Sequence, residues 1–323
     1  MPDNEVVLGV DIGGTFTKYG LVDSKGICLN QNSILTDPKK GAEDLFERLF
    51  GNVKTLLAEN PEKNLVGIGL GAPNANYYKG TVELPPNLNW GIVDVVGIVK
   101  KYYAVPAVIT NDANAAAIGE FKFGAAKGMR DFIVITLGTG LGSGIFCNGN
   151  LVYGHDGFAG EIGHTIAIRN GRNCGCGRKG CLETYASASG IRRTVSELLA
   201  NNVEPSILRD VTFNDLTSRE IFDAALQEDK IALEAFEYTG MILGSTLADS
   251  VAYTSPEAII LFGGLASAGD LIIQPTKKYM EENLLNIFKN KVSIIPSGLS
   301  EGNTAVLGAA ALIWNELEKT ATY

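Results

Sequence analysis

The chain lacks the features of membrane, secreted and nucleic-acid-binding proteins. No apolar run in its 323 residues approaches the roughly 18 residues that a membrane helix requires. Residues 1–5 are acidic and are not followed by a separate apolar segment, so we predict no signal peptide and expect a cytoplasmic protein. No run of Lys and Arg occurs, and the net charge is −9 at pH 7. Because nucleic-acid-binding proteins normally carry a basic face, we expect neither nucleic acid nor a membrane as a partner.

Two common nucleotide-binding motifs are also missing. The chain has no GxxxxGK[ST] sequence, which excludes a P-loop protein. The run 138–144 does not fit GxGxxG because Ser143 occupies the last position, so a dinucleotide-binding fold is disfavoured.

What the chain does contain is one pattern that occurs twice. A strand pattern over 6–11, a Gly-Gly-Thr turn at 13–15 and a second strand pattern over 16–22 open the sequence. Strand patterns over 132–137 and 142–147 again flank a Gly-Thr-Gly turn. Helical spacing over 41–58, 112–123 and 304–317 completes a mixture of strands and helices. The pattern predicts an α/β protein with two lobes and a duplicated core.

The two turns are candidate phosphate loops. Glycine lets the backbone N–H groups of a turn approach a phosphate closely. Asp11, Gly13, Gly14 and Thr15 form the first turn, and Gly138, Thr139 and Gly140 form the second. Lys18 could reach back to a phosphate, and Asp11 could hold Mg²⁺ through water. The alternative is that both are tight turns without a ligand.

An Asn-Asp pair follows a predicted strand that ends at 110. Asp112 opens a predicted helix, and a carboxylate at this position is often only a helix N-cap. The end of a strand is also where α/β enzymes place their chemistry. Phosphoryl transfer to a hydroxyl needs an acceptor for the hydroxyl proton, a role that fits Asp112, and Asn111 could orient the same substrate.

Three of the five cysteines fall within eight positions, which favours a metal site over disulfides. Cys174, Cys176 and Cys181 follow His164, and together they can supply the four ligands of a closed, structural zinc site. The alternative is free thiols or a disulfide. Glu161 and Glu183 bracket this segment, and carboxylates suit the neighbouring hydroxyls of a sugar.

These residues resemble the ROK family, which comprises bacterial sugar kinases and their relatives, including repressors. The resemblance covers essentially the whole chain. Its most specific stretches are residues 160–164, Gly-Glu-Ile-Gly-His, and a CxCGxxGCxE run that ends at Glu183. Two departures occur, at residues 72–76, Ala-Pro-Asn-Ala-Asn, where many members have Pro-Gly, and at Leu265, where members often have another glycine.

The resemblance implies the roles of the site residues. Asp112 matches the catalytic base, and the zinc ligands match His164, Cys174, Cys176 and Cys181. The positions that match sugar ligands are Asn87, Asn111, Asp112, Glu161, His164 and Glu183. The turns Asp11–Thr15 and Thr136–Gly142, which include Thr136, resemble the phosphate loops, and Gly263 and Gly264 resemble part of the adenosine site.

The resemblance also implies the fold and the reaction. The expected fold is actin/hexokinase-like (ribonuclease H-like), with a small lobe over 1–111 plus 305–323 and a large lobe over 112–304 that carries the zinc loop and a dimerisation surface. The expected partners are a hexose, ATP and a second copy of the chain. The expected reaction forms glucose 6-phosphate from glucose, with Mg²⁺ and structural Zn²⁺.

Several alternatives stay open. N-acetylglucosamine, N-acetylmannosamine, mannose or fructose could replace glucose, and polyphosphate could replace ATP. A sugar-responsive transcriptional regulator or an inactive sensor is the alternative outside the enzymes. Related repressors carry a DNA-binding domain ahead of the kinase-like part, and here the first phosphate loop begins at Asp11.

Overall fold

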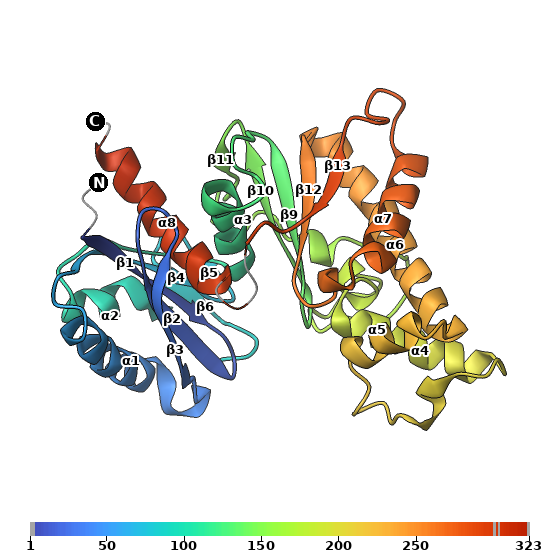
Figure 1. Ribbon diagram of the computed structural model, residues 1–323, viewed down its shortest axis with the longest axis horizontal. Coiled ribbons are helices and arrows are strands. Elements are labelled where there is room, and N and C mark those ends of the chain that lie inside the picture. The colour runs from blue at the N-terminus through green and yellow to red at the C-terminus, as the bar shows by residue number, and fades with distance from the viewer. Residues whose placement is uncertain (1–3, 300–301, 303, 322–323) are drawn as a thin grey trace. The chain divides into compact units, whose positions relative to one another are not determined.

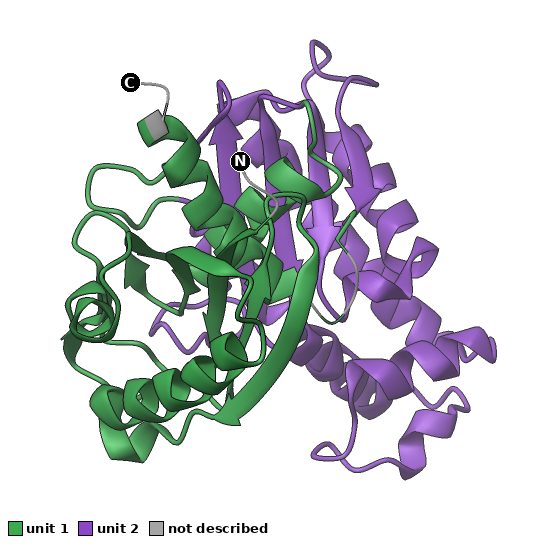
Figure 2. Cartoon of the chain, turned by 60° about the vertical axis from the view of Figure 1, so that its left-hand side comes forward, with its two compact units in different colours: residues 1–128, 151–159, 298–323 green, residues 129–150, 160–297 purple. Residues whose placement is uncertain are grey.

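The computed structural model describes residues 4–299, 302 and 304–321, and the chain divides into two compact units. Unit 1 contains residues 1–128, 151–159 and 298–323, and unit 2 contains residues 129–150 and 160–297 (Figure 2). Within the described residues, no helix has both the length and the apolar character needed to cross a membrane.

Unit 1 is built on a five-stranded sheet in the order β3-β2-β1-β4-β8 (Figure 1). The strands are β1 (Glu5–Ile12), β2 (Phe16–Val22), β3 (Cys28–Leu35), β4 (Asn64–Gly71) and β8 (Ala107–Thr110). The helices are α1 (Gly41–Ala58), α2 (Val95–Tyr102), α3 (Asp112–Phe123) and α8 (Thr304–Ala321). A small second sheet contains β5 (Ala75–Asn76), β6 (Thr81–Glu83) and β7 (Ile92–Asp94).

Both faces of the first sheet are covered by helices, which explains the continuous apolar run in β1. Val6, Leu8 and Val10 belong to a core that includes the buried residues of α1 and α2. Val7, on the opposite face, belongs to a core with Val306 and other residues of α8. Helix α8 lies very close to this face, because a Cβ added at Gly69 of β4 would be 1.9 Å from the Ala309 carbonyl oxygen. Glycine in β4 is therefore required by helix packing.

Unit 2 repeats the same sheet in the order β11-β10-β9-β12-β13. The strands are β9 (Phe132–Leu137), β10 (Leu141–Cys147), β11 (Asn150–Leu151), β12 (Ala258–Phe262) and β13 (Ser293–Pro296). The helices are α4 (Ala188–Asn201), α5 (Ser218–Leu226), α6 (Lys230–Thr254) and α7 (Asp270–Asn283). In unit 1, β1 pairs antiparallel with β2 and parallel with β4. In unit 2, β9 pairs antiparallel with β10 and parallel with β12 in the same way. The predicted duplication of the core is confirmed.

The division of the chain differs from the predicted boundaries at 111/112 and 304/305. Residues 112–128, 151–159 and 298–304 fall in unit 1. Helix α3 packs closely on α8, since a Cβ added at Gly308 would lie 2.6 Å from the Ala115 carbonyl oxygen. Segment 151–159 is held by the buried Asn76, whose Nδ2 donates to the Asp156 carbonyl oxygen at 2.8 Å. Residues 1–3, 300–301, 303 and 322–323, which the predicted lobes include, lie outside the described residues.

Candidate active site

Two carboxylates lie at one edge of the unit 1 sheet. Asp11 is near the end of β1, and Asp112 begins α3, which follows β8. Because β1, β4 and β8 are parallel neighbours, their carboxyl ends meet at the same edge. A Cβ added at Gly71, the last residue of β4, would lie 3.8 Å from Asp11 Oδ1 and 3.8 Å from Asp112 Cα. The structure therefore brings Asp11 and Asp112 together around the end of β4.

The N-cap of helix α3 is Asn111 and not Asp112. The Asn111 side chain accepts a hydrogen bond from the Ala113 N–H at 2.8 Å. Asp112 Oδ1 accepts from the same N–H, also at 2.8 Å, and its side chain stays exposed. A ligand can therefore reach the Asp112 carboxylate.

The surroundings of both carboxylates favour the protonated form. Desolvation and the neighbouring Asp112 raise the pKa of Asp11 to about 6, although the ammonium of Lys18 lowers it in part. Lys18 is the residue directly opposite Asp11 in the β1–β2 hairpin. Asp112 keeps solvent-accessible surface, but the protein atoms around its carboxylate still desolvate it and raise its pKa, and the Ala113 N–H opposes part of this rise. A higher pKa makes an ionised carboxylate a stronger proton acceptor.

The raised pKa of Asp11 predicts that Asp11→Asn stabilises the protein at neutral pH. An Asp whose folded pKa exceeds its unfolded value opposes folding above pH 6, and this cost disappears as the pH falls from about 6 toward 3.8. In Mg²⁺-free buffer we expect the variant to exceed the wild type in free energy of unfolding at pH 7 by about 3 kcal/mol at most. Urea denaturation at pH 7 and pH 5 should show the difference shrinking at pH 5. A variant that is less stable at pH 7 would contradict the prediction.

The first glycine-threonine turn connects β1 to β2 and lies against Asn87. The Gly13 N–H donates to the Phe16 carbonyl oxygen at 3.1 Å, and the Thr36 hydroxyl donates to the Gly13 carbonyl oxygen at 2.7 Å. A Cβ added at Gly14 would be 3.1 Å from the Asn87 Cβ. Two predicted site residues from distant parts of the chain are thus adjacent, and Thr15 and Lys18 are exposed beside them.

Asn74 explains how the chain tolerates its departure from Pro-Gly. It has a φ of 53°, in the left-handed region that asparagine tolerates better than most other non-glycine residues. Its Nδ2 donates to the Glu83 and Leu84 carbonyl oxygens at 3.2 and 3.1 Å. Asn74 therefore occupies a conformation that glycine also adopts, and its side chain holds the loop to β6.

The second glycine-threonine turn occupies the same place in unit 2, between β9 and β10. Thr136 Oγ1 accepts from the Gly142 N–H at 3.1 Å, and the Gly138 N–H donates to the Gly140 carbonyl oxygen at 3.0 Å. The first residue of α4, Ala188, donates its N–H to the Gly138 carbonyl oxygen at 2.9 Å. Thr139 is exposed at the tip of the turn.

The Gly263-Gly264 pair lies next to this turn. Gly263 has a φ of 103°, and a Cβ added there would be 2.8 Å from the Leu137 carbonyl oxygen. Leu265, the second departure from the family pattern, is 1 % exposed and donates its N–H to the same oxygen at 3.1 Å. The leucine side chain therefore serves the core of unit 2, while Gly264 stays exposed.

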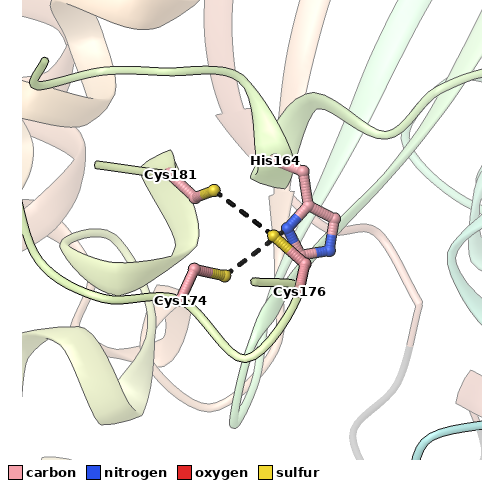
Figure 3. A group of neighbouring side chains, drawn as sticks. All are labelled: His164, Cys174, Cys176 and Cys181. Atoms are coloured by element: carbon pink, nitrogen blue, oxygen red, sulfur yellow. Dashed lines mark hydrogen bonds between the residues drawn. The ribbon is translucent and has the colours of Figure 1, made fainter. Parts of the chain in front are cut away.

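The four predicted metal ligands form one cluster (Figure 3). The ligand atoms of His164, Cys174, Cys176 and Cys181 all lie within 4.8 Å of one another. Cys174 Sγ is 3.7 Å from His164 Nδ1, and Cys176 Sγ is 3.6 Å from Cys181 Sγ. Ligands about 2.3 Å from a tetrahedral ion are separated by about 3.8 Å. The donor set and its spacing therefore fit a tetrahedral metal site.

Glu183 connects the cluster to the second turn. One carboxylate oxygen lies 3.5 Å from Cys174 Sγ, and the other accepts from the Leu141 N–H at 3.2 Å. A Cβ added at Gly140 would overlap this carboxylate, at 2.2 Å from Oε2. Glu183 therefore holds the loop that carries the His/Cys cluster, residues 164–183 (the metal loop, after its predicted ligands), against the turn, a contact that the sequence did not predict.

Ser143 is a further positioning residue that the sequence analysis missed. Its buried hydroxyl donates to the Gly160 carbonyl oxygen and accepts from the Ile162 N–H at 3.2 Å. The exposed Glu161 lies between these two residues, and the His164 N–H donates to the Glu161 carbonyl oxygen at 3.1 Å. The only signal was a serine within the apolar pattern of β10.

One mixed sheet, repeated in both units with a glycine-threonine turn between its antiparallel strands, defines an α/β protein of the actin/hexokinase-like class. Within this class, the two turns, the edge carboxylates and the His/Cys cluster are the features that match the ROK family. The chain belongs to the ROK family, whose model matches residues 7–316.

Similar proteins include enzymes and a regulator. A glucokinase of Halalkalibacterium halodurans is 35% identical over 285 residues, which cover 85% of this chain and 84% of that protein. A solved ROK family glucokinase from Streptomyces griseus, in complex with glucose and AMPPNP, is 33% identical, with a TM-score of 0.81 and coverage of 95% of this chain and 98% of that one. A solved ROK family transcriptional regulator, homologous to the E. coli MLC protein, is 25% identical, with a TM-score of 0.86 and coverage of 97% and 78%.

Proposed function

We propose that this protein is an ATP-dependent sugar kinase that transfers the γ-phosphoryl group of ATP to a hexose hydroxyl, forming glucose 6-phosphate from glucose. The observation that carries the proposal is the accessible Asp112 carboxylate beside Asp11, at the carboxyl ends of parallel strands. Relatives named glucokinase, including one solved with glucose and AMPPNP, support both the reaction and the substrate.

In the proposed reaction Asp112 accepts the proton of the attacking hydroxyl as the phosphoryl group is transferred. Its raised pKa strengthens it as an acceptor while the hydroxyl develops negative charge. The backbone N–H groups of the two glycine-threonine turns and the hydroxyls of Thr15 and Thr139 hold phosphates. Mg²⁺, when bound with ATP, neutralises phosphate charge, and Asp11 is the residue placed to hold it through water.

The proposed sugar ligands are Asn87, Asn111, Asp112, Glu161, His164 and Glu183. His164 turns Nδ1 toward Cys174, which leaves Nε2 as the ring atom for a sugar hydroxyl (Figure 3). Gly263 and Gly264, beside the second turn, are proposed to contact the adenosine.

The metal in the cluster is proposed to be Zn²⁺. Three thiolates and one imidazole are a common structural zinc shell, and the ion would fill all four positions with protein ligands. The metal would thus fix the loop that carries Glu161 and Glu183 and take no part in the reaction. Resemblance to the family also supports a homodimer.

A panel of sugars tests the proposed function. ADP release with Mg-ATP is measured for glucose, mannose, fructose, N-acetylglucosamine and N-acetylmannosamine. We expect the highest kcat/KM for glucose. A higher value for another sugar would correct the substrate, and no turnover with any sugar would refute the kinase.

A sugar-responsive regulator or sensor is the second candidate, because the transcriptional regulator has a TM-score of 0.86 to this chain. This candidate predicts sugar binding by calorimetry without ADP release. Turnover that depends on Asp112 would exclude it.

A further inference from the structure

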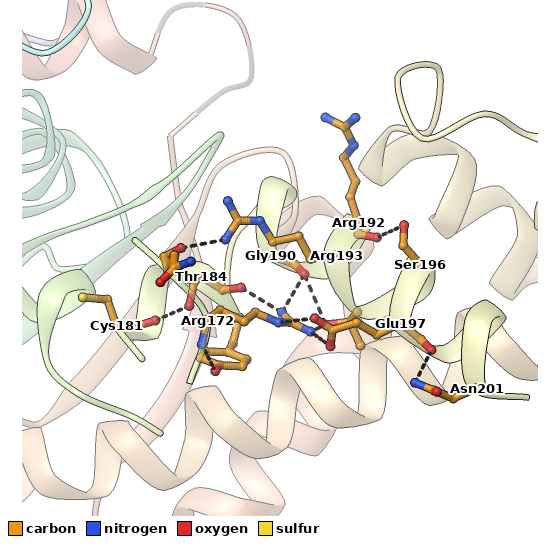
Figure 4. A network of polar contacts seen from close by, with 12 residues as sticks. Arg172, Cys181, Thr184, Gly190, Arg192, Arg193, Ser196, Glu197 and Asn201 are labelled. Carbon is orange, nitrogen blue, oxygen red and sulfur yellow. Dashed lines mark hydrogen bonds and ion pairs between the residues drawn. The ribbon is translucent and has the colours of Figure 1, made fainter. Parts of the chain in front are cut away.

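Arg172 joins the metal loop to helix α4. It lies two residues before Cys174, and its side chain is only 10% exposed. The guanidinium donates to the Thr184 carbonyl oxygen at 2.8 Å and to two groups of α4: the Gly190 carbonyl oxygen at 3.1 Å and Thr194 Oγ1 at 3.0 Å. It also forms a bidentate pair with Glu197 at 2.9 and 2.5 Å (Figure 4).

The aromatic ring of Tyr185 completes the setting of Arg172. The guanidinium carbon lies 4.5 Å from the ring centroid. The backbone N–H of Arg172 donates to the Tyr185 hydroxyl at 2.8 Å. Planar donors in a fork and a flat face for stacking are properties of arginine that lysine lacks. The site therefore selects for the shape of the side chain as well as for its charge.

The N-terminus of α4 contacts the second glycine-threonine turn. Ala188 donates its N–H to the Gly138 carbonyl oxygen at 2.9 Å, and Ser189 donates to the Thr139 carbonyl oxygen at 3.4 Å. Ser187 caps the helix by accepting from the Gly190 N–H, and its hydroxyl donates to the Glu183 carbonyl oxygen at 2.7 Å. Gly190, an acceptor for Arg172, is thus within one helical turn of the residues that hold Gly138 and Thr139.

We propose that Arg172 is a positioning residue for the phosphate-binding turn. Arg172 fixes α4 to the metal loop. It therefore sets the position of the α4 N-terminus relative to the turn at 138–140, and with it the conformation of that turn. The ligand affected is the phosphate chain of the nucleotide, which Arg172 itself does not touch. The inference rests on the proposed function, because it assigns the turn to the nucleotide.

Arg172→Met and Arg172→Lys test this role against Arg192→Met as a matched control. Arg192 is on helix α4 and, like Arg172, stacks on an aromatic ring, that of Phe213, at 4.8 Å. Its guanidinium donates to the Phe213 carbonyl oxygen and makes no hydrogen bond to the loop that contains Cys174. We expect both Arg172 variants to raise the KM for ATP about tenfold, the effect typical of residues that orient a site from one layer behind it. The hexose dissociation constant and the zinc content should stay at the wild-type values, and the control should stay within about twofold in KM for ATP.

The outcomes separate positioning from simple stabilisation. A lower Tm with an unchanged KM for ATP would show that Arg172 only stabilises the fold and would overturn the proposal. Recovery of the wild-type KM in Arg172→Lys would overturn the requirement for the arginine fork. If the wild type phosphorylates no sugar, the proposed function fails; the dissociation constant of AMPPNP, measured by calorimetry in wild type and Arg172→Met, then still decides whether Arg172 positions the turn.

Discussion

Asp112→Asn is expected to lower kcat for hexose phosphorylation by about 10²–10⁴-fold, the range that a general base contributes. Asparagine has nearly the same shape, and its side-chain oxygen can still accept from the Ala113 N–H, as Asp112 Oδ1 does at 2.8 Å. It cannot take a proton from the sugar hydroxyl. The hexose dissociation constant, measured by calorimetry, should therefore change much less than kcat.

Asp94→Asn is the matched control for this experiment. Asp94 is also an Asp at the start of a helix of unit 1, where it caps α2 by accepting from the Gly97 N–H at 2.8 Å. It belongs to none of the predicted site residues, so kcat should stay near the wild-type value. Equal turnover in Asp112→Asn and Asp94→Asn would eliminate Asp112 as the base.

Cys181→Ser is expected to abolish binding of the proposed Zn²⁺ and with it the proposed kinase activity. Cys181 is fully buried, and its Sγ lies 3.6 Å from that of Cys176. A serine hydroxyl is a poor zinc ligand, and structural zinc sites contribute about 10–16 kcal/mol in small peptides, so loss of a ligand has a large effect. The zinc content, measured by metal analysis, should fall from about one ion per chain to nearly none. The Tm should fall as well, because the loop from 164 to 183 loses its central crosslink.

Cys147→Ser controls for the chemical change from sulfur to oxygen. Cys147 is exposed at the end of β10 and lies outside the His/Cys cluster. This variant should keep its zinc, its Tm and its activity. Wild-type protein that is purified without chelators and contains no zinc would contradict the metal assignment itself.

The sequence predicted those parts of the fold whose signals are local. The helices over 41–58 and 112–123 have the predicted bounds, and the duplicated hairpins follow from their glycine-threonine turns. The His/Cys cluster was predictable because its three cysteines lie within eight positions of one another, so the chain keeps them close in space. The small sheet of β5, β6 and β7 was missed because strands of two or three residues carry almost no periodicity.

The parts that the sequence did not predict depend on tertiary packing. Helix α3 belongs to unit 1 because of glycine and alanine contacts with α8, and no local pattern indicates which helix an alanine-rich segment will meet. Asn and Asp cap helices about equally well, and Asn111 and Asp112 are adjacent. The sequence alone therefore did not indicate which of them caps α3. The partners of Arg172 lie up to 25 positions away in the sequence. An arginine close to a metal ligand looks the same in the sequence whether it is solvated or buried.

The covering of the first sheet by α8 has a consequence for how the protein is made. About 300 residues separate β1 from α8, so at 5–20 residues per second α8 leaves the ribosome about 15–60 s after β1. Until then the apolar face of the sheet that contains Val7 and Val22 lacks α8, the helix that supplies Val306, Ala310 and Trp314 to the core on this face. Nascent chains would therefore expose an apolar sheet face for most of their synthesis. Chaperones that bind nascent chains would be needed most before α8 has been synthesised.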